Sequence, residues 1–216
     1  MPKFPLIRFA LAAAASTAIA GAAVAPVAFA PAAFAQASDP AAAKIESFNA
    51  AVIKTLQAGH AAGAAGRAKV VGPAVEQTFD LAYMTRVAVG PDWAKMSADD
   101  QSALLKAYSR YAVANWAKNF DNYSGQKLEL NGPVIDRGGD KLVKTKLTGP
   151  GASPVTLDYR MRDTGMGWRV IDVFYNGGIS QIATQRSDFM STLQSGGAKA
   201  LVAKLDSLTE KLLKAS

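Results

Sequence analysis

The sequence predicts an α+β fold, in which N-terminal and C-terminal helices pack against a curved antiparallel sheet of four strands. Apolar residues recur at helical spacing from Ile45 to Phe120, and the period changes to two between Leu128 and Tyr175. Helical spacing returns after Gly177-Gly178. We find no internal repeat, so this order of elements predicts a single domain.

The first residues have the pattern of a secretory signal peptide. Lys3 and Arg8 flank the start of an Ala-rich apolar run, and Ala33-Phe34-Ala35 provides an A-x-A cleavage site. We therefore expect cleavage after residue 35, with residues 36–216 forming the mature domain. The loss of Lys3 and Arg8 lowers the formal net charge from +7 to +5. Cysteine is absent, so the exported domain must be stabilised by packing alone.

Four helices are predicted before the sheet. The first begins at Ser38-Asp39-Pro40, which combines a capping side chain with a proline suited to the first turn. The second is expected from Gly63 to Val71, ended by Gly72-Pro73, and the third begins near Asp80. Ser97 is the expected N-cap of the fourth helix.

The fourth helix carries one apolar stripe with several large aromatic side chains. Its members recur at helical spacing: Leu105, Tyr108, Ala112, Trp116 and Phe120. Such a stripe is usually protein core. The pattern fits the second wall of a ligand pocket equally well.

The predicted sheet is a meander whose last two strands form a hairpin. The strands are expected at residues 128–135, with a bend at Gly132-Pro133, and at residues 142–147, 155–162 and 168–175. If Tyr159 pairs opposite Ile171, alternation places one set of large side chains on a single face. These residues are Leu157, Tyr159, Met161, Ile171, Val173 and Tyr175. Either protein core or a ligand could cover this apolar wall.

Two helices are predicted after the sheet. The first carries apolar residues from Ile179 to Leu193, and Gly196-Gly197 then interrupts the pattern. The last helix carries Leu201, Leu205, Leu208 and Leu212 at helical spacing.

The residue types exclude several kinds of chemistry. With no cysteine and a single histidine, His60, the chain cannot build a thiol active site, a Ser-His-Asp triad or a zinc site from these residues. We expect no cofactor and no metal. Acid/base catalysis by Asp172 with Tyr159 on an apolar substrate remains the alternative. The simpler interpretation of Asp172 is an ion pair with Arg160 on the neighbouring strand. Lysine and arginine are dispersed, which argues against a nucleic-acid partner.

Several sequence blocks resemble a known family. They occur in one order: V-G-P-D-W at 89–93, N-F-D-N-Y-S-G at 119–125, L-D-Y-R-M-R at 157–162, G-W-R-V-I-D-V at 167–173 and Q-R-S-D-F at 185–189. Together they resemble the MlaC or toluene-tolerance family of periplasmic phospholipid-binding proteins. The second block and I-S-Q-I-A-T-Q-R-S-D-F are most similar to its hopanoid-associated HpnM branch.

The resemblance implies a non-enzymatic lipid carrier in the periplasm. A phospholipid or a hopanoid would insert its apolar part between sheet and helices, and the protein would carry it between an inner-membrane transporter complex, MlaD-like or hopanoid-specific, and an outer-membrane acceptor or donor. A monomer is expected. At the mouth, the expected lipid contacts are Phe79, Leu81, Met84, Val87 and Trp93. Deeper contacts are expected from the fourth-helix residues Leu105, Tyr108, Ala112 and Trp116, from Val143 and Leu147, and from the six residues of the apolar wall.

Overall fold

The computed structural model describes residues 39–214. The predicted signal peptide lies outside the described residues. Within them the chain forms an α+β fold with five α-helices and one antiparallel sheet. The predicted fold class is therefore confirmed.

The first helix begins where its capping signal predicts. In α1 (Pro40–Ala58), the Asp39 carboxylate accepts a hydrogen bond from the Ala41 N–H at 2.9 Å. The helix ends at Gly59, and a short 3-10 turn, η1 (His60–Ala62), leads into the second helix.

The second helix is longer than predicted. α2 (Gly63–Thr78) continues through Pro73, although Gly72-Pro73 was expected to end it. Pro73 is exposed, whereas Val71 and Val75 on either side of it are fully buried. Burial of the apolar face therefore outweighs the one backbone hydrogen bond that proline removes.

The next two helices start where predicted, near Asp80 and at the Ser97 cap. Asp80 accepts the Tyr83 N–H at 2.8 Å at the start of α3 (Leu81–Val89). A 3-10 turn, η2 (Gly90–Lys95), follows, and the Ser97 hydroxyl then accepts the Asp100 N–H at the start of α4 (Ala98–Asn119).

The sheet has six strands in the described residues, so the prediction of four was wrong. Its strands are β1 (Lys127–Leu130), β2 (Ile135–Arg137), β3 (Asp140–Thr148), β4 (Val155–Asp163), β5 (Trp168–Tyr175) and β6 (Ile179–Ser180). Their order is β1-β3-β4-β5-β6, and β2 also pairs with β3. The first predicted strand is in fact two strands, divided near Gly132, which has φ +96°. The two-residue β6 is too short to give a periodic pattern.

A β-bulge changes the predicted register of the central hairpin. Tyr159 pairs with Val173, not with Ile171, and Met161 pairs with Val170. The register shifts between Arg160 and Met161, so β5 contains one extra residue there. Val170 therefore joins Val173 on the apolar face, in the place expected for Ile171.

The C-terminal region forms two helical halves. α5 (Gln181–Lys214) is continuous except at Gly197, where φ is +65° and ψ is −162°. This break confirms the one predicted at Gly196-Gly197. A residue with a side chain would be strained in that conformation, so glycine allows the chain to turn back there.

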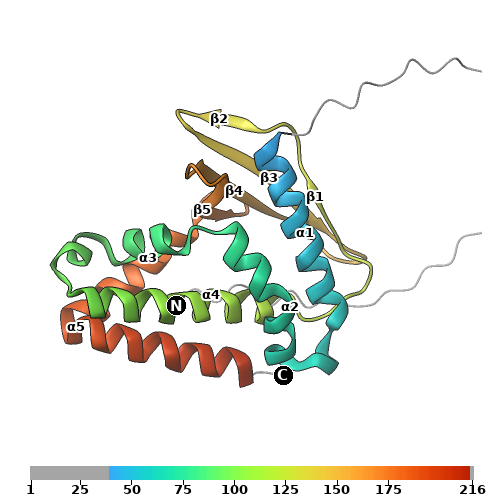
Figure 1. The fold of residues 1–216 in the computed structure, drawn as a ribbon. Coiled ribbons are helices and arrows are strands. Elements are labelled where there is room, and N and C mark those ends of the chain that lie inside the picture. Colours follow the sequence, from blue (N-terminus) through green and yellow to red (C-terminus); the bar gives the residue numbers. More distant parts are fainter. Residues whose placement is uncertain (1–38, 215–216) are drawn as a thin grey trace, which may run out of the picture.

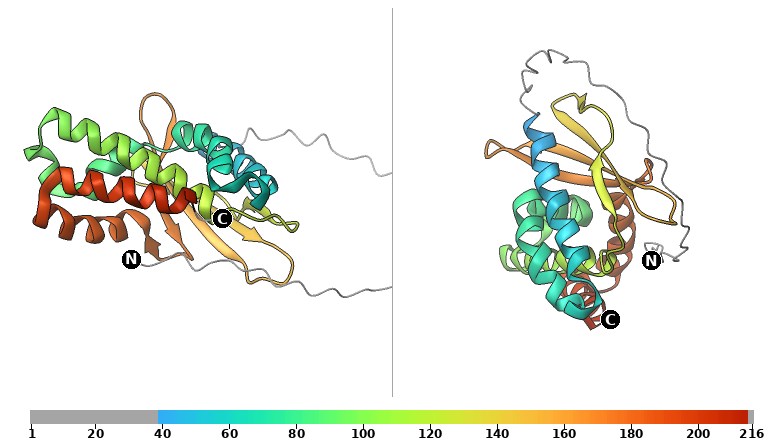
Figure 2. Two further views of the ribbon diagram at one scale, coloured as in Figure 1. Left: turned by 90° about the horizontal axis from the view of Figure 1, so that it is seen from below. Right: turned by 90° about the vertical axis from the view of Figure 1, so that its right-hand side faces the viewer.

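The helices lie on one side of the sheet. α1 crosses the sheet, while α4 and the second half of α5 run side by side away from it (Figure 1). The loop between β4 and β5 projects from the body of the molecule (Figure 2). This arrangement gives the sheet an inner face, which the helices cover, and an outer face, where the start of α5 contacts Asp172.

Candidate functional site

The inner face of the sheet is an apolar wall. Three neighbouring strands contribute side chains to it through the pairs Val143–Tyr159 and Tyr159–Val173. Val143, Tyr159 and Met161 are no more than 1% exposed. Alternation along the strands thus gathers the large apolar residues on the side that meets the helices.

Four aromatic rings join this wall to the helices. Phe48 of α1 lies at the centre, with its ring centroid 5.1 Å from Phe79, 4.9 Å from Trp116 and 6.1 Å from Tyr159. All three contacts are edge-to-face, the geometry that aromatic quadrupoles favour. We call Phe48, Phe79, Trp116 and Tyr159 the aromatic cluster. It connects α1, α4 and the α2–α3 junction to β4.

Tyr159 contributes a polar group to this apolar environment. Its hydroxyl is buried and has no hydrogen-bond partner among the described residues. The nearby Thr145 hydroxyl donates to the carbonyl oxygen of Leu157 at 2.8 Å. Burial raises the pKa of Tyr159, so the phenol stays protonated at neutral pH. The Thr145 hydroxyl opposes this pKa shift, but no hydrogen bond within 3.5 Å joins the two groups, so the phenol is a donor without an acceptor at hydrogen-bond distance.

Tyr108, the other buried tyrosine, has a partner. Its hydroxyl donates to Oε1 of Gln185 on α5 at 2.7 Å, and its ring lies edge-on to Phe189 with the centroids 6.3 Å apart. Burial raises the pKa of Tyr108 as well. Tyr108 therefore fastens α4 to α5, whereas the hydroxyl of Tyr159 has no such structural role.

Most of the residues predicted to contact lipid meet in one apolar cluster. Fifteen of the seventeen belong to it or pack against it. They are Phe79, Leu81, Met84, Val87, Trp93, Tyr108, Ala112, Trp116, Val143, Leu147, Leu157, Tyr159, Met161, Val173 and Tyr175. The predicted mouth residues of α3 and the predicted wall of the sheet thus belong to the same continuous interface.

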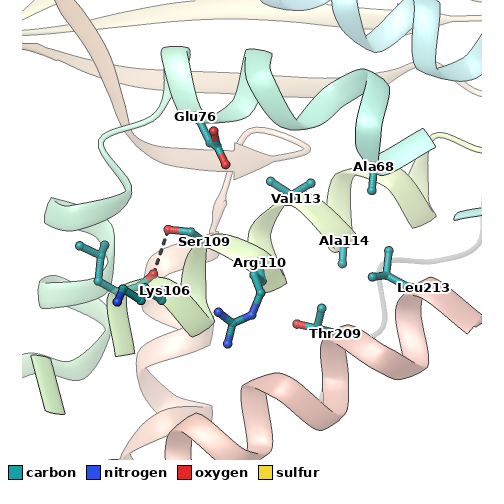
Figure 3. Close-up of a pocket in the computed structure, with 10 residues that line it drawn as sticks. Ala68, Glu76, Lys106, Ser109, Arg110, Val113, Ala114, Thr209 and Leu213 are labelled. Atoms are coloured by element: carbon teal, nitrogen blue, oxygen red, sulfur yellow. Dashed lines mark hydrogen bonds between the residues drawn. The ribbon is translucent and has the colours of Figure 1, made fainter. Parts of the chain in front are cut away.

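The other two residues lie elsewhere. Ile171 is buried but lies outside this cluster, because the bulge gives its place to Val170. Leu105 faces a different hollow, a groove of about 440 Å³ between α2, α4 and α5 (Figure 3). The groove has an apolar floor with charged Glu76, Lys106 and Arg110 around it.

The carboxylate considered for catalysis has a structural role. Asp172 accepts hydrogen bonds from the Ser180 hydroxyl at 2.6 Å and from the Ile182 N–H at 3.2 Å, at the start of α5. It pairs in register with Arg160, whereas Tyr159 pairs with Val173, so Asp172 and Tyr159 are directed to opposite faces. They do not form a common acid/base site.

The predicted ion pair between Asp172 and Arg160 is also absent. Arg160 Nε donates instead to Asp140 at 2.7 Å. Arg162 Nε donates to the same carboxylate at 2.6 Å, and its hydrogen bond is the main reason that the pKa of Asp140 is lowered. The arginine was correctly placed on the charged face, but its partner comes from the other neighbouring strand.

Two important residues were not predicted as part of the site. Phe48 was predicted only as a helix residue, although it lies at the centre of the aromatic cluster. Gln185 belongs to the block at 185–189 that carries the family resemblance, and in the structure it is the partner of Tyr108. Helical spacing places Phe48 in the first helix, but nothing local in the sequence indicates which distant rings it meets.

Neither a membrane span nor a metal site is found between residues 39 and 214. No helix in this range is long and apolar enough to cross a bilayer. No three histidine, aspartate or glutamate side chains there lie close enough together to hold a metal ion.

Comparison with known proteins shows the family. The family model described as MlaC protein matches residues 46–207. A solved structure, the phospholipid-binding protein from Ralstonia solanacearum in complex with a phospholipid, superposes with a TM-score of 0.68 at 22% identity. The match covers 82% of this chain and 100% of that one. A search of the curated proteins finds no match. The likeness to the Ralstonia structure shows a shared fold, and the family match, which extends from α1 into the second half of α5, shows that this chain belongs to the MlaC family.

Proposed function

We propose that this protein is a periplasmic lipid carrier that holds the apolar part of one lipid between the inner face of the sheet and the helices. The observation that carries the proposal is the aromatic cluster, where a continuous apolar interface encloses the unpartnered Tyr159 hydroxyl. A buried donor without an acceptor costs about 1 to 3 kcal/mol. An ester or phosphate oxygen of a lipid would relieve that cost, whereas a purely structural core would gain nothing from the hydroxyl.

Family membership supports the same function. The chain belongs to the MlaC family, and the Ralstonia protein of the same fold is described as phospholipid-binding. The signal-peptide pattern of residues 1–35 supports export to the periplasm. We infer transfer between inner-membrane and outer-membrane complexes, because a carrier in an aqueous compartment needs a donor and an acceptor.

The energetics suit a carrier. Two acyl chains of about 15 methylenes each, at about 0.8 kcal/mol per methylene, are worth about 24 kcal/mol relative to water. That exceeds the practical ceiling of about 18 to 21 kcal/mol for non-covalent affinity. The relevant reference is a membrane, where the chains are already in hydrocarbon. Transfer between membrane and protein is then nearly balanced, and the carrier itself needs no energy source.

The proposal allows two kinds of lipid as the cargo. A phospholipid is supported by the family and by the Ralstonia protein, while a hopanoid is suggested by the blocks at 119–125 and 179–189. A rigid pentacyclic body requires a differently shaped cavity from two flexible chains, so the two cargos are alternatives.

Native mass spectrometry of the protein isolated from periplasm tests the function. We expect one lipid per chain, released on unfolding and identified by its mass. A diacyl phospholipid would identify the first cargo and a hopanoid the second. A chain that arrives without lipid and takes none from vesicles would contradict the carrier function.

A further inference from the structure

The outer face of the sheet carries a second groove. Unlike the apolar interface, this groove is lined partly by charged side chains. It is a groove of about 420 Å³ on the side of the sheet opposite Tyr159. Its lining comes from β2, β3, β4, β5 and the turn after β5, and comprises Arg137, Leu142, Asp158, Arg160, Phe174 and Gly177. Two apolar side chains thus lie beside one carboxylate and two guanidinium groups.

The carboxylate of this groove lacks a partner. Asp158 is only 7% exposed, and its Oδ1 atom is buried without a hydrogen bond among the described residues. Lys144 is its cross-strand neighbour, but no ion pair within 4.0 Å joins the two. Burial raises the pKa of Asp158, and the charge of Lys144 opposes this shift. Asp158 therefore offers an unused acceptor to a hydrogen-bond donor that enters the groove.

The other end of the groove has an excess of positive charge. Arg160 and Arg162 both donate to Asp140, which is 4% exposed, so one carboxylate serves two guanidinium groups. Arg137 pairs in register with Asp140 from β2 and has no ion pair of its own in the described part of the chain. Arg160 has five N–H donors and uses only part of them on Asp140. Arg137 and Arg160 therefore have N–H donors left over at this end of the groove.

These two ends have a defined separation. Asp158 and Arg160 lie two residues apart on one strand, which places their Cα atoms about 7 Å apart on the same face. Leu142 on β3 lies opposite Arg160, and Phe174 on β5 lies opposite Asp158, so each end of the groove has one apolar neighbour. We propose that this groove binds a small zwitterion of the phosphoethanolamine class, whose ammonium donates to Asp158 while its phosphate accepts from Arg137 and Arg160. The ligand is either a free solute or the headgroup of a lipid.

Isothermal titration calorimetry of the full mature protein tests the site. The probes are O-phosphoethanolamine, phosphocholine and inorganic phosphate. We expect phosphoethanolamine to bind at least tenfold more tightly than the other two, because inorganic phosphate lacks the ammonium and phosphocholine has no N–H to donate. Equal binding of all three probes, or no binding of phosphoethanolamine, would overturn the proposal.

Two variants separate the ends of the site. Asp158→Asn keeps the shape of the side chain and should lower the affinity for phosphoethanolamine about tenfold, with inorganic phosphate bound no more weakly than before. Arg137→Gln, on an exposed strand, should weaken both ligands. If Asp158→Asn leaves the preference for phosphoethanolamine unchanged, the ammonium does not bind there and the proposal is wrong.

Vesicles distinguish the two sources of the zwitterion. Sedimentation with phosphatidylethanolamine vesicles, but not with phosphatidylcholine vesicles, would assign the site to a lipid headgroup. Binding of the soluble probe alone would assign it to a free solute. Because the groove and the aromatic cluster lie on opposite faces, Asp158→Asn should take up lipid tails like the wild type. The proposal can therefore fail while the carrier function holds, and the reverse.

Discussion

The two faces of the sheet differ in polarity, because the inner face is apolar and the outer face carries charged side chains. The inner face buries Tyr159, Met161 and Val173 against the helices and leaves a single hydroxyl without a partner. On the outer face, charged side chains of the same strands gather around Asp140 and Asp158. Alternation with period two is sufficient to separate them. A strand of nine residues, β4, thereby serves an apolar interface and a charged groove at once.

The comparison also shows where unsatisfied groups lie. Each face carries one buried polar group without a partner, the hydroxyl of Tyr159 inside and the carboxylate of Asp158 outside. For each of these two groups the chain has a residue of the same type that does have a partner. Tyr108 donates to Gln185, and Asp140 accepts from two arginines. Matched substitutions within these pairs therefore separate structural groups from those that are free to meet a ligand.

The largest expected effect is on the inner face. Phe48→Ala should lower the free energy of unfolding by about 3 to 5 kcal/mol, because it removes the ring at the centre of the aromatic cluster. Phe174→Ala, on the half-exposed outer face, is the matched control and should cost about 1 kcal/mol. Urea unfolding followed by circular dichroism measures both. Equal losses would show that the two faces do not differ in packing.

The next largest effect concerns Asp140, the carboxylate on the outer face that accepts hydrogen bonds from two arginines. Asp140→Asn should cost about 1 to 2 kcal/mol at pH 7, since two partly exposed arginines lose their shared counterion. Hydrogen bonding by Arg162 lowers the pKa of Asp140 in the folded state. Its stabilisation is therefore present above the unfolded pKa of about 3.9 and disappears as the pH falls through the lower folded value. Unfolding curves of wild type and variant should converge in acid. A difference that persists there would contradict this assignment.

Removing the hydroxyl of Tyr108, the tyrosine that has a partner, should have a smaller cost. Tyr108→Phe loses the hydrogen bond to Gln185 and should lower the free energy of unfolding by about 1 kcal/mol. Tyr159→Phe loses only an unpartnered hydroxyl, so its stability should equal or slightly exceed that of the wild type. If the hydroxyl meets a lipid oxygen, this second variant should instead retain less ester lipid after purification. Wild-type lipid content in Tyr159→Phe would exclude that contact.

The smallest effect has the opposite sign. Asp158→Asn should raise the free energy of unfolding by about 0.5 to 1 kcal/mol at pH 7, because it removes a buried charge without a hydrogen bond. Burial raises the pKa of Asp158, so the folded state favours the protonated form and the charge destabilises above that pKa. The gain should shrink as the pH is lowered through it. Thermal unfolding of the wild type and Asp158→Asn between pH 7 and pH 4 measures this gain. A stability difference that stays constant with pH would contradict the prediction.

Local signals in the sequence predicted the elements well. Capping residues predicted the starts of α1 and α4, and Gly196-Gly197 predicted the break in α5. Alternation along β4 gave the division into an apolar and a charged face. These features are determined by interactions between residues close in the chain, so a short stretch of sequence is enough to predict them.

Features that depend on distant partners were not predictable in the same way. The bulge opposite Arg160 shifts β5 by one residue, and this exchanged Ile171 for Val170 on the inner face. Pro73 did not end α2, because the burial of Val71 and Val75 is decided by tertiary packing. Asp140 attracts Arg160 and Arg162 from the neighbouring strand, a choice that alternation alone leaves open.

The central claim is that lipid tails lie between the inner face and the helices, and tryptophan fluorescence tests it most directly. The chain has three tryptophans, of which Trp116 belongs to the aromatic cluster. A Trp93→Phe, Trp168→Phe variant leaves Trp116 as the only reporter. Loading it with one equivalent of a phospholipid brominated along its acyl chains should quench the fluorescence, relative to the same lipid without bromine. Stoichiometric loading with unchanged fluorescence would place the tails elsewhere and contradict the account.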